Sequence, residues 1–197
     1  MFNILCVTNR RLCREDFIQR IEKIASANPV GILLREKDLS EEEYENLAKT
    51  VITICKKKHI PCILHNFVDV AEKLKNSALH LPLDKLRSLS PLQRAKFSTL
   101  GASCHSLKDA IEAKKLGATY ITAGHIFDTD CKKGVPGRGI EFLKEICLQG
   151  ALPVYAIGGV SAGNIRLVKE AGATGACVMS GIMQTDDIYE YLKGLKV

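Results

Sequence analysis

Short apolar runs alternate with amphipathic stretches along the whole chain, with about two dozen residues from one run to the next. A strand followed by a helical segment at such a spacing is typical of a βα unit. We expect eight strands, at residues 3–7, 31–35, 61–65, 78–81, 99–103, 119–123, 153–157 and 175–179. Eight such units in a row predict an α/β fold, a single (β/α)8 TIM barrel, with the active site on the loops that follow the strands.

The segments between the strands carry helix signals. Ser40 and Glu43 have the spacing of a capping box, and apolar residues at helical period follow. Ser106 begins a second clear helix, which Gly117 closes. The connection over residues 83–97 is the weakest part of the pattern, because Ser90-Pro91 interrupts it. An open doubly wound sheet is therefore the alternative to the barrel.

Length and composition indicate one domain, which we place at residues 1–197. No apolar run approaches the roughly 20 residues that span a bilayer, so we expect a cytoplasmic protein without a membrane partner. The net charge of +6 comes from scattered positive residues, and it favours a small anionic ligand over nucleic acid. The oligomeric state stays open, a homo-oligomer included.

The eight cysteines form no CxxC pair, and several lie in apolar strand-like runs, which is typical of reduced thiols in a core. Cys62 and His65 have a spacing that resembles part of a zinc site, but no further ligands cluster with them and we expect no metal. Cys104 and His105 are neighbours on a strand, so they point to opposite faces and do not form a nucleophile and its base.

The segment from Gly124 to Gly139 holds the strongest candidate for chemistry. His125 directly follows the strand at residues 119–123, and it therefore lies at the carboxyl end, where barrels keep their active sites. Histidine titrates near neutral pH and can take up and return a proton without a metal or cofactor. We therefore predict that His125 is catalytic.

Two pairs of small residues, Gly158-Gly159 and Ser180-Gly181, follow the seventh and eighth expected strands. In a TIM barrel these loops frequently bind phosphate through backbone N–H groups. Glycine lets the backbone approach the anion closely, so we expect a side chain at Gly159 to fill the space of the phosphate. The pattern predicts a phosphate cradle at these two loops.

The second strand ends in a cluster of charges. Pleat alternation sends Arg35 and Lys37 to one side and Glu36 to the other. Two cations on one side suit a carboxylate or a phosphate. The alternative is a solvated strand end in which they pair with Glu36 or Asp38.

Other strand ends carry neutral polar groups. Ser103 is expected to donate a hydrogen bond at the barrel mouth. His65 and Asn66 end the third strand, and they face the mouth or the interior of the barrel. His80, between two leucines, is more typical of a core wall than of a catalyst.

The motifs together resemble one family. Seven segments, spread in order over nearly the whole length of the chain, carry the resemblance: LLREKDLSEEEYENLA, HNFVDVA, ALHLP, GASCHS, GHIFDTDCKKG, AIGGVSAGN and CVMSGIM. These segments resemble the thiamine phosphate synthase/TenI superfamily. The resemblance implies a phosphate-binding barrel that handles the thiazole phosphate half of thiamine, with Gly159 and Ser180 at the phosphate.

The synthases of this superfamily carry an Asn-Asp pair after the third strand and a Gly-Gln-Glu-Asp run after the fourth, and their aspartates hold magnesium against a pyrophosphate. In this chain His65-Asn66 and Pro82-Leu83-Asp84-Lys85 stand at these places. Asn66 and Lys85 supply no negative charge for a hard magnesium ion, and Asp84 offers one carboxylate.

TenI-type thiazole tautomerases also lack these acids, and they carry a Gly-His pair and a Thr-Asp-Cys-Lys-Lys-Gly loop like the one here. The resemblance implies that His125 aromatises a carboxylated thiazole phosphate tautomer without a cofactor, with Thr129, Lys132 and Arg35 at the substrate; Lys37 is often arginine in such proteins. Two alternatives stay open. One is a thiamine phosphate synthase that joins thiazole phosphate to a pyrimidine pyrophosphate with magnesium, and the other is a non-catalytic phosphoester-binding regulatory protein.

Overall fold

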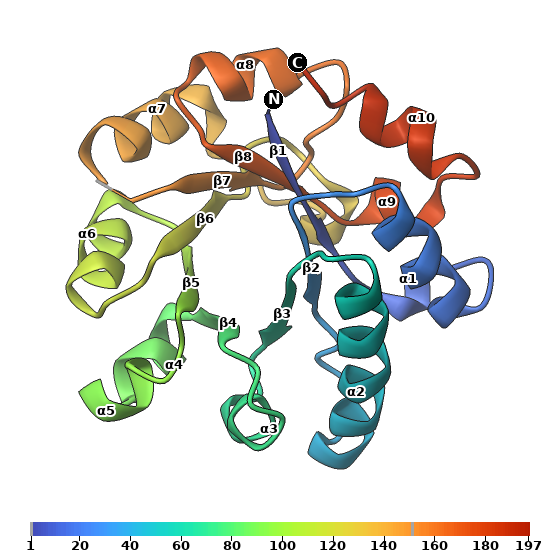
Figure 1. Cartoon of the computed structure of the whole chain (residues 1–197). Helices are drawn as coiled ribbons and strands as arrows, with labels where there is room; N and C mark the ends of the chain where they lie inside the picture. The colour runs from blue at the N-terminus through green and yellow to red at the C-terminus, as the bar shows by residue number, and fades with distance from the viewer. Residues whose placement is uncertain (1, 151) are drawn as a thin grey trace.

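Eight parallel strands close into a barrel in the order of the sequence, in a computed structural model that describes residues 2–150 and 152–197. Figure 1 shows the strands around the barrel axis with the helices outside them. The closed barrel confirms the expected TIM fold and excludes the open doubly wound sheet. Every strand end lies within one residue of its expected place: β1 Asn3–Val7, β2 Gly31–Leu34, β3 Cys62–His65, β4 Ala78–Pro82, β5 Thr99–Cys104, β6 Tyr120–Gly124, β7 Val154–Ile157 and β8 Gly175–Val178.

The helices cover the outside of the barrel. They are α1 Phe17–Ser26, α2 Glu41–Lys57, α3 Val68–Lys73, α4 Leu83–Ser88, α5 Pro91–Arg94, α6 Leu107–Lys115, α7 Gly139–Gln149, α8 Ile165–Glu170, α9 Ser180–Gln184 and α10 Ile188–Lys193, with 3-10 turns η1 Arg10–Leu12 and η2 Asp130–Lys132. None of the helices in the described ranges is long and apolar enough to cross a membrane.

Local signals account for the helix starts. The capping box of Ser40 and Glu43 is present at the start of α2, and Ser106 caps α6. The weak segment over residues 83–97 forms α4 and α5. Ser90 and Gln93 make a second capping box there, with Pro91 in the first turn. Proline suits that position because its missing N–H has no intrahelical partner, so Ser90-Pro91 begins a helix rather than breaking one.

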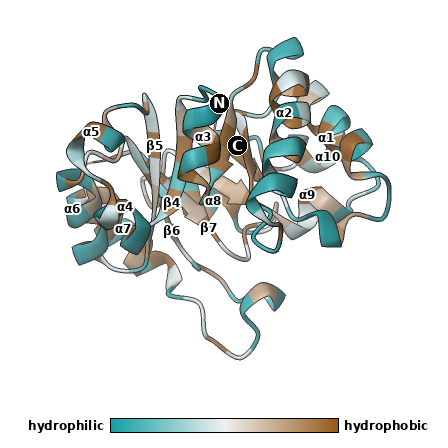
Figure 2. Ribbon diagram, turned by 90° about the horizontal axis from the view of Figure 1, so that it is seen from below, coloured by the Kyte–Doolittle hydropathy of each residue, from teal (hydrophilic) through white to brown (hydrophobic). Residues whose placement is uncertain are grey.

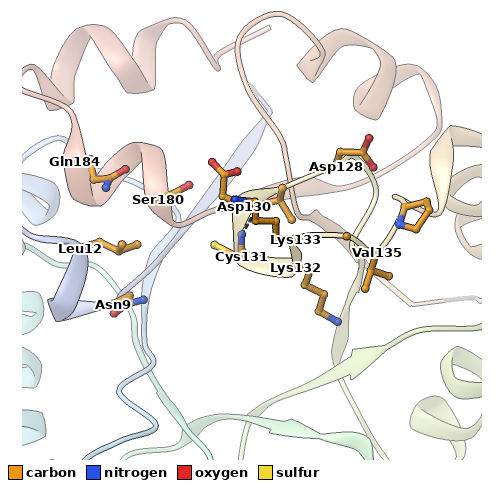
Figure 3. A pocket seen from close by; sticks show the side chains of 13 residues that line it. Asn9, Leu12, Asp128, Asp130, Cys131, Lys132, Lys133, Val135, Ser180 and Gln184 are labelled. Atoms are coloured by element: carbon orange, nitrogen blue, oxygen red, sulfur yellow. Dashed lines mark hydrogen bonds between the residues drawn. The ribbon is translucent and has the colours of Figure 1, made fainter.

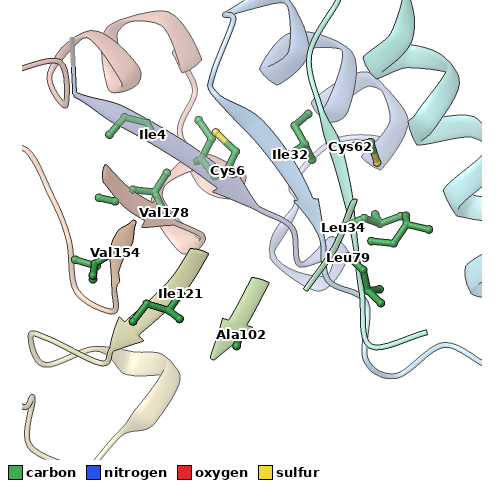
Figure 4. Close-up of a cluster of buried hydrophobic side chains, with 14 of the residues drawn as sticks. Ile4, Cys6, Ile32, Leu34, Cys62, Leu79, Ala102, Ile121, Val154 and Val178 are labelled. Atoms are coloured by element: carbon green, nitrogen blue, oxygen red, sulfur yellow. The ribbon is translucent and has the colours of Figure 1, made fainter. Parts of the chain in front are cut away.

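Alternate residues of each strand face the helices and the barrel interior. The outward side chains, such as Ile32, Leu34 and Ile121, pack against the helices in the main core (Figure 4). Figure 2 shows hydrophilic residues concentrated on the surrounding helices. The inward side chains form a smaller apolar cluster of Leu5, Val7, Leu33, Ile63, Tyr120 and Cys177. Val7, Leu33 and Cys177 of this cluster also line a cavity at the barrel mouth, so they form part of its floor.

Gly101 on β5 makes room for a buried polar pair in the interior. A Cβ at this position would lie 2.3 Å from both Nδ1 of His80 and Cζ of Tyr120, whose hydroxyl lies 3.0 Å from that Nδ1. We expect Gly101→Ala to lower the free energy of unfolding by about 1–3 kcal/mol, the usual cost of overpacking a core. Urea unfolding checks this, with Gly163→Ala as the control, because a Cβ there lies 3.8 Å from its nearest neighbour. Equal midpoints for the two variants would contradict the prediction.

Candidate functional site

The carboxyl ends of the strands surround a cavity of about 320 Å³. Its walls come from segments that lie far apart in the sequence, as expected for the mouth of a barrel. The lining includes every residue that the sequence analysis assigned to the site: Arg35, Lys37, Ser103, His125, Thr129, Lys132, Gly158, Gly159, Ser180 and Gly181. The barrel therefore brings these residues together, and their roles stay predictions.

His125 begins the β6–α7 loop and is only 7% exposed. Its Nε2 lies 3.0 Å from the carbonyl oxygen of Val135, in the same loop. A carbonyl can only accept a hydrogen bond, so Nε2 carries the proton in the neutral ring and Nδ1 keeps the lone pair. Gly158 leaves space for this side chain, since a Cβ there would lie 2.3 Å from Cβ of His125. Nδ1 is therefore the basic atom of His125.

Hydrogen bonds between its two ends close the β6–α7 loop at its base. The N–H of Gly137 donates to the Asp128 carboxylate at 2.8 Å, and the N–H of Arg138 donates to the His125 carbonyl at 2.9 Å. A second cavity of about 920 Å³ lies between this loop and the side formed by η1 and α9 (Figure 3). Thr129, Cys131, Lys132 and Ser180 line both spaces, so the two cavities adjoin.

Three cations face the inner cavity: Arg35 and Lys37 after β2, and Lys132 from η2. The pKa of Lys37 lies below its ordinary value because its ammonium group is partly buried and because the charges of Arg35 and Lys132 repel it. Positive charge gathered in this way suits an anionic ligand.

Glu36 and Asp38 do not neutralise these cations. Glu36 turns away from the cavity, where its carboxylate accepts hydrogen bonds from the Thr8 hydroxyl at 2.7 Å and from the backbone N–H of Arg10 at 3.1 Å. Asp38 forms ion pairs with Arg10 and Arg11, each at 2.7 Å. Glu36 and Asp38 therefore pair with groups of η1 and not with Arg35 and Lys37, the local pairing that the sequence left open.

The inner cavity does not offer the ligands that magnesium prefers. Within the described ranges, its lining contains no aspartate or glutamate. Asn66 and Lys85 stand in place of the synthase aspartates. They lie next to each other, with Nζ of Lys85 3.4 Å from the carbonyl oxygen of Asn66. An ammonium group thus stands where the ion would need carboxylates, and Asp84 is exposed on the first turn of α4. This donor set does not fit a magnesium ion.

The β7–α8 loop and the start of α9 border the cavity where the phosphate cradle was expected. Gly158 and Gly159 have φ angles of +97° and +67°, which favour glycine. Helix α9 begins at Ser180 without a side-chain cap, so its first backbone N–H groups have no intrahelical partner. One expectation is wrong. A Cβ at Gly159 would lie 2.5 Å from the carbonyl oxygen of Asp128, so a side chain there would displace the β6–α7 loop instead of filling the phosphate space.

Ser180 offers a cleaner test of the phosphate cradle. We expect Ser180→Asp to raise KM for a phosphorylated substrate by about 10-fold, because a carboxylate a few ångströms from a phosphate repels it. Gln184→Asp places the same charge at the other end of α9 and serves as the control. Steady-state kinetics on both variants, with inorganic phosphate as a competitor, gives the comparison. An equal KM in the two variants would place the phosphate elsewhere.

Sequence reasoning did not assign some residues that line the cavity. Nδ1 of His105 donates to the carbonyl of Gly124 at 2.8 Å, and its ring lines the cavity while Cys104 packs in the outer core. Its place directly after a strand was the available signal. Thr122 is two residues from Gly124 on β6, so the strand period also indicates that it faces inward. Tyr191 comes from α10, and nothing in the sequence connects it to the mouth.

Comparison with known proteins gives the family. Residues 4–182 match the TMP-TENI family model, described as thiamine monophosphate synthase. The chain is 33% identical over 201 residues to a thiamine-phosphate synthase of Desulfitobacterium hafniense, covering 98% of this chain and 95% of that protein. It is 35% identical over 184 residues to thiamine-phosphate synthase 2 of Streptococcus pneumoniae serotype 4, covering 92% and 88%.

A solved structure is also similar to this chain. The thiamine phosphate pyrophosphorylase from Pyrococcus furiosus superposes with a TM-score of 0.85 at 26% identity, covering 99% of this chain and 94% of that one. The relatives named here carry synthase or pyrophosphorylase names, which favours the synthase alternative over the tautomerase. The superfamily indicated by the sequence motifs is confirmed: the chain belongs to the thiamine monophosphate synthase family, TMP-TENI.

Proposed function

We propose that this protein is a thiazole tautomerase, which converts a carboxylated thiazole phosphate tautomer to its aromatic form. The observation that carries the proposal is the composition of the inner cavity. It combines a histidine with a free Nδ1, three cations, and no carboxylate among the lining residues that the structure describes. Such a set suits proton transfer on an anionic substrate.

The reaction needs one base and no other reactant. Nδ1 of His125 takes the proton from the ring carbon next to the carboxylate, and the imidazolium returns it to the exocyclic carbon, so atoms and charge balance. Aromatisation supplies the driving force, and general acid-base catalysis of this kind contributes about 10²- to 10⁴-fold in rate. The Val135 carbonyl holds the Nε2 proton and orients the ring. Arg35 and Lys132 stabilise the negative charge that spreads into the carboxylate.

The synthase is the second candidate, and the names of the relatives favour it. Its pyrophosphate leaving group gathers negative charge, which magnesium held by carboxylates normally neutralises. In this chain Arg35, Lys37 and Lys132 are the groups available for that charge. Because the described lining residues offer no carboxylate to hold magnesium, the cavity composition supports the tautomerase more strongly than the synthase.

The proposal is tested by adding purified protein to the thiazole tautomer in the presence of EDTA. We expect the aromatic absorbance to grow with multiple turnovers, since His125 needs no metal to transfer a proton. Conversion at the uncatalysed rate would refute the tautomerase function.

A further inference from the structure

One peptide unit at the barrel mouth is held by two side chains that have no part in the mechanism above. It joins Leu34, the last residue of β2, to Arg35, which lines the inner cavity. Its carbonyl accepts a hydrogen bond from the Tyr44 hydroxyl at 2.6 Å, and its N–H donates to the Thr8 hydroxyl at 2.9 Å. Both polar groups of this peptide are therefore held, and we call the Tyr44 and Thr8 hydroxyls the hydroxyl clamp.

Tyr44 reaches the peptide from α2, on the outside of the barrel. Its side chain is fully buried, and its ring stacks on Phe67 with the centroids 4.2 Å apart. The hydroxyl also accepts a hydrogen bond at 2.9 Å from the N–H of His65, the last residue of β3. Burial holds the pKa of Tyr44 well above its usual range, so the hydroxyl keeps the proton that it donates to Leu34. One hydroxyl thus connects the ends of β2 and β3.

Thr8 reaches the same peptide from the other side, directly after β1. It is fully buried, and its hydroxyl donates to Oε1 of Glu36 at 2.7 Å. A hydroxyl has one proton, so this donation fixes its oxygen as the acceptor for the N–H of Arg35. The end of β2 is therefore held toward β1 by Thr8 and toward β3 by Tyr44.

The side chain of Arg35 has no comparable anchor. Within the described ranges, the ion pairs of this region belong to Arg10 and Arg11 and not to Arg35. Its Nη1 lies 3.9 Å from Sδ of Met179, which is a weak acceptor. The place of the guanidinium in the cavity therefore depends on the backbone that carries it.

We propose that Tyr44 and Thr8 are positioning residues, which act through the Leu34–Arg35 peptide to orient Arg35 toward a ligand in the inner cavity. Tyr44 packs in the outer core, and neither residue is part of the described cavity lining, so neither needs to contact the ligand. The task of Arg35, to stabilise negative charge during the reaction, rests on the proposed function. A misplacement of about 1 Å can cost about 10²-fold in rate, so the clamp affects catalysis as well as stability.

Removal of one hydroxyl at a time tests the clamp. We expect Tyr44→Phe and Thr8→Val each to lower kcat for aromatisation by about 10-fold, with a smaller change in KM, because the group that they displace acts on charge in the transition state. Thr8→Ser keeps a hydroxyl and should recover most of the rate. Wild-type kcat in both Tyr44→Phe and Thr8→Val, whatever their melting temperatures, would reduce the clamp to a structural feature and overturn the proposal.

Tyr189→Phe and Thr53→Val are matched controls for the loss of a hydroxyl. Tyr189 donates to the carbonyl of Ser26 at 2.9 Å, and Thr53 donates to the carbonyl of Lys49 at 2.8 Å. Both residues are exposed, and neither lines the inner cavity. We expect wild-type kcat in both controls, and thermal unfolding of every variant separates a loss of rate from a loss of fold.

A double-mutant cycle shows whether the clamp acts through Arg35. Arg35→Gln should itself lower kcat by at least about 10-fold, because it removes a cation that stabilises developing charge. In the Arg35→Gln background, Tyr44→Phe should change kcat by less than about twofold, since the group that it positions is already absent. Equal losses from Tyr44→Phe in the two backgrounds would contradict a positioning role.

NMR relaxation gives a readout that needs no activity. The order parameter of the Arg35 Nε–H vector should fall in Tyr44→Phe and in Thr8→Val, and it should keep its wild-type value in the two control variants. An order parameter that is the same in the wild type and both clamp variants would overturn the proposal. A fall in order without turnover of the tautomer would uphold the clamp and refute the tautomerase function. Turnover with kcat and order parameter unchanged in both clamp variants would do the reverse.

Discussion

His125→Ala is expected to lower kcat for aromatisation of the thiazole tautomer by about 10²- to 10⁴-fold, the usual contribution of a positioned acid-base group. KM should change little, because the cations and the loops after β7 and β8 that we assign to binding remain. The free Nδ1 of His125 is the basic atom in this account, and alanine supplies no replacement. Stopped-flow or steady-state growth of the aromatic absorbance gives the rate.

A variant of the residue that orients His125 provides the control. Val135 contributes its backbone carbonyl to the Nε2 proton, and its side chain is exposed. Val135→Ala keeps that carbonyl, so we expect near wild-type kcat. A His125→Ala protein that retains most of its kcat and its thermal stability would place the proton transfer on another group, with His105 as the next histidine at the mouth.

Formation of thiamine phosphate from thiazole phosphate and the pyrimidine pyrophosphate should be slower than aromatisation by at least about a thousandfold, even with millimolar magnesium. Loss of about 4 kcal/mol of leaving-group stabilisation has this effect on a rate. The physical reason is the pair formed by Asn66 and Lys85, which places an amide and an ammonium group where the ion would need carboxylates. Product analysis by chromatography measures the reaction.

The double variant Asn66→Asp, Lys85→Asp extends this test. It restores two carboxylates at adjacent positions, so magnesium binding and any trace of synthase rate should both rise. Asp84→Asn is the matched control, because Asp84 is exposed beside Lys85. The wild type could form thiamine phosphate at a rate comparable to that of tautomerisation. If that rate then falls in Asp84→Asn, Asp84 is a metal ligand after all.

The sequence predicted the barrel well because its signals are local and repeated. Each strand is a short apolar run, and helices such as α2 start at a capping box that needs only Ser40 and Glu43. Once eight βα units close in order, strand ends far apart in the sequence meet at one mouth. That is why Arg35, Ser103, His125 and Ser180 could be assigned to one site before their distances were known.

The details that the sequence did not predict depend on contacts between distant segments. The bond from His125 to the Val135 carbonyl depends on the path of the β6–α7 loop, and the approach of Gly159 to Asp128 depends on the packing of that loop against β7. The position of Tyr191 requires α10 to pack beside the mouth. Pro91 was misjudged for a local reason, because proline both ends helices and favours their first turn.

The most direct test measures both reactions on one preparation. Aromatisation of the tautomer is followed in EDTA, and thiamine phosphate formation is followed with magnesium, for the wild type and for His125→Ala. The central expectation is rapid metal-independent aromatisation that His125→Ala lowers by about 10²- to 10⁴-fold, and a synthase rate lower by at least about a thousandfold. A synthase rate that exceeds the aromatisation rate, with aromatisation unaffected by His125→Ala, would contradict it.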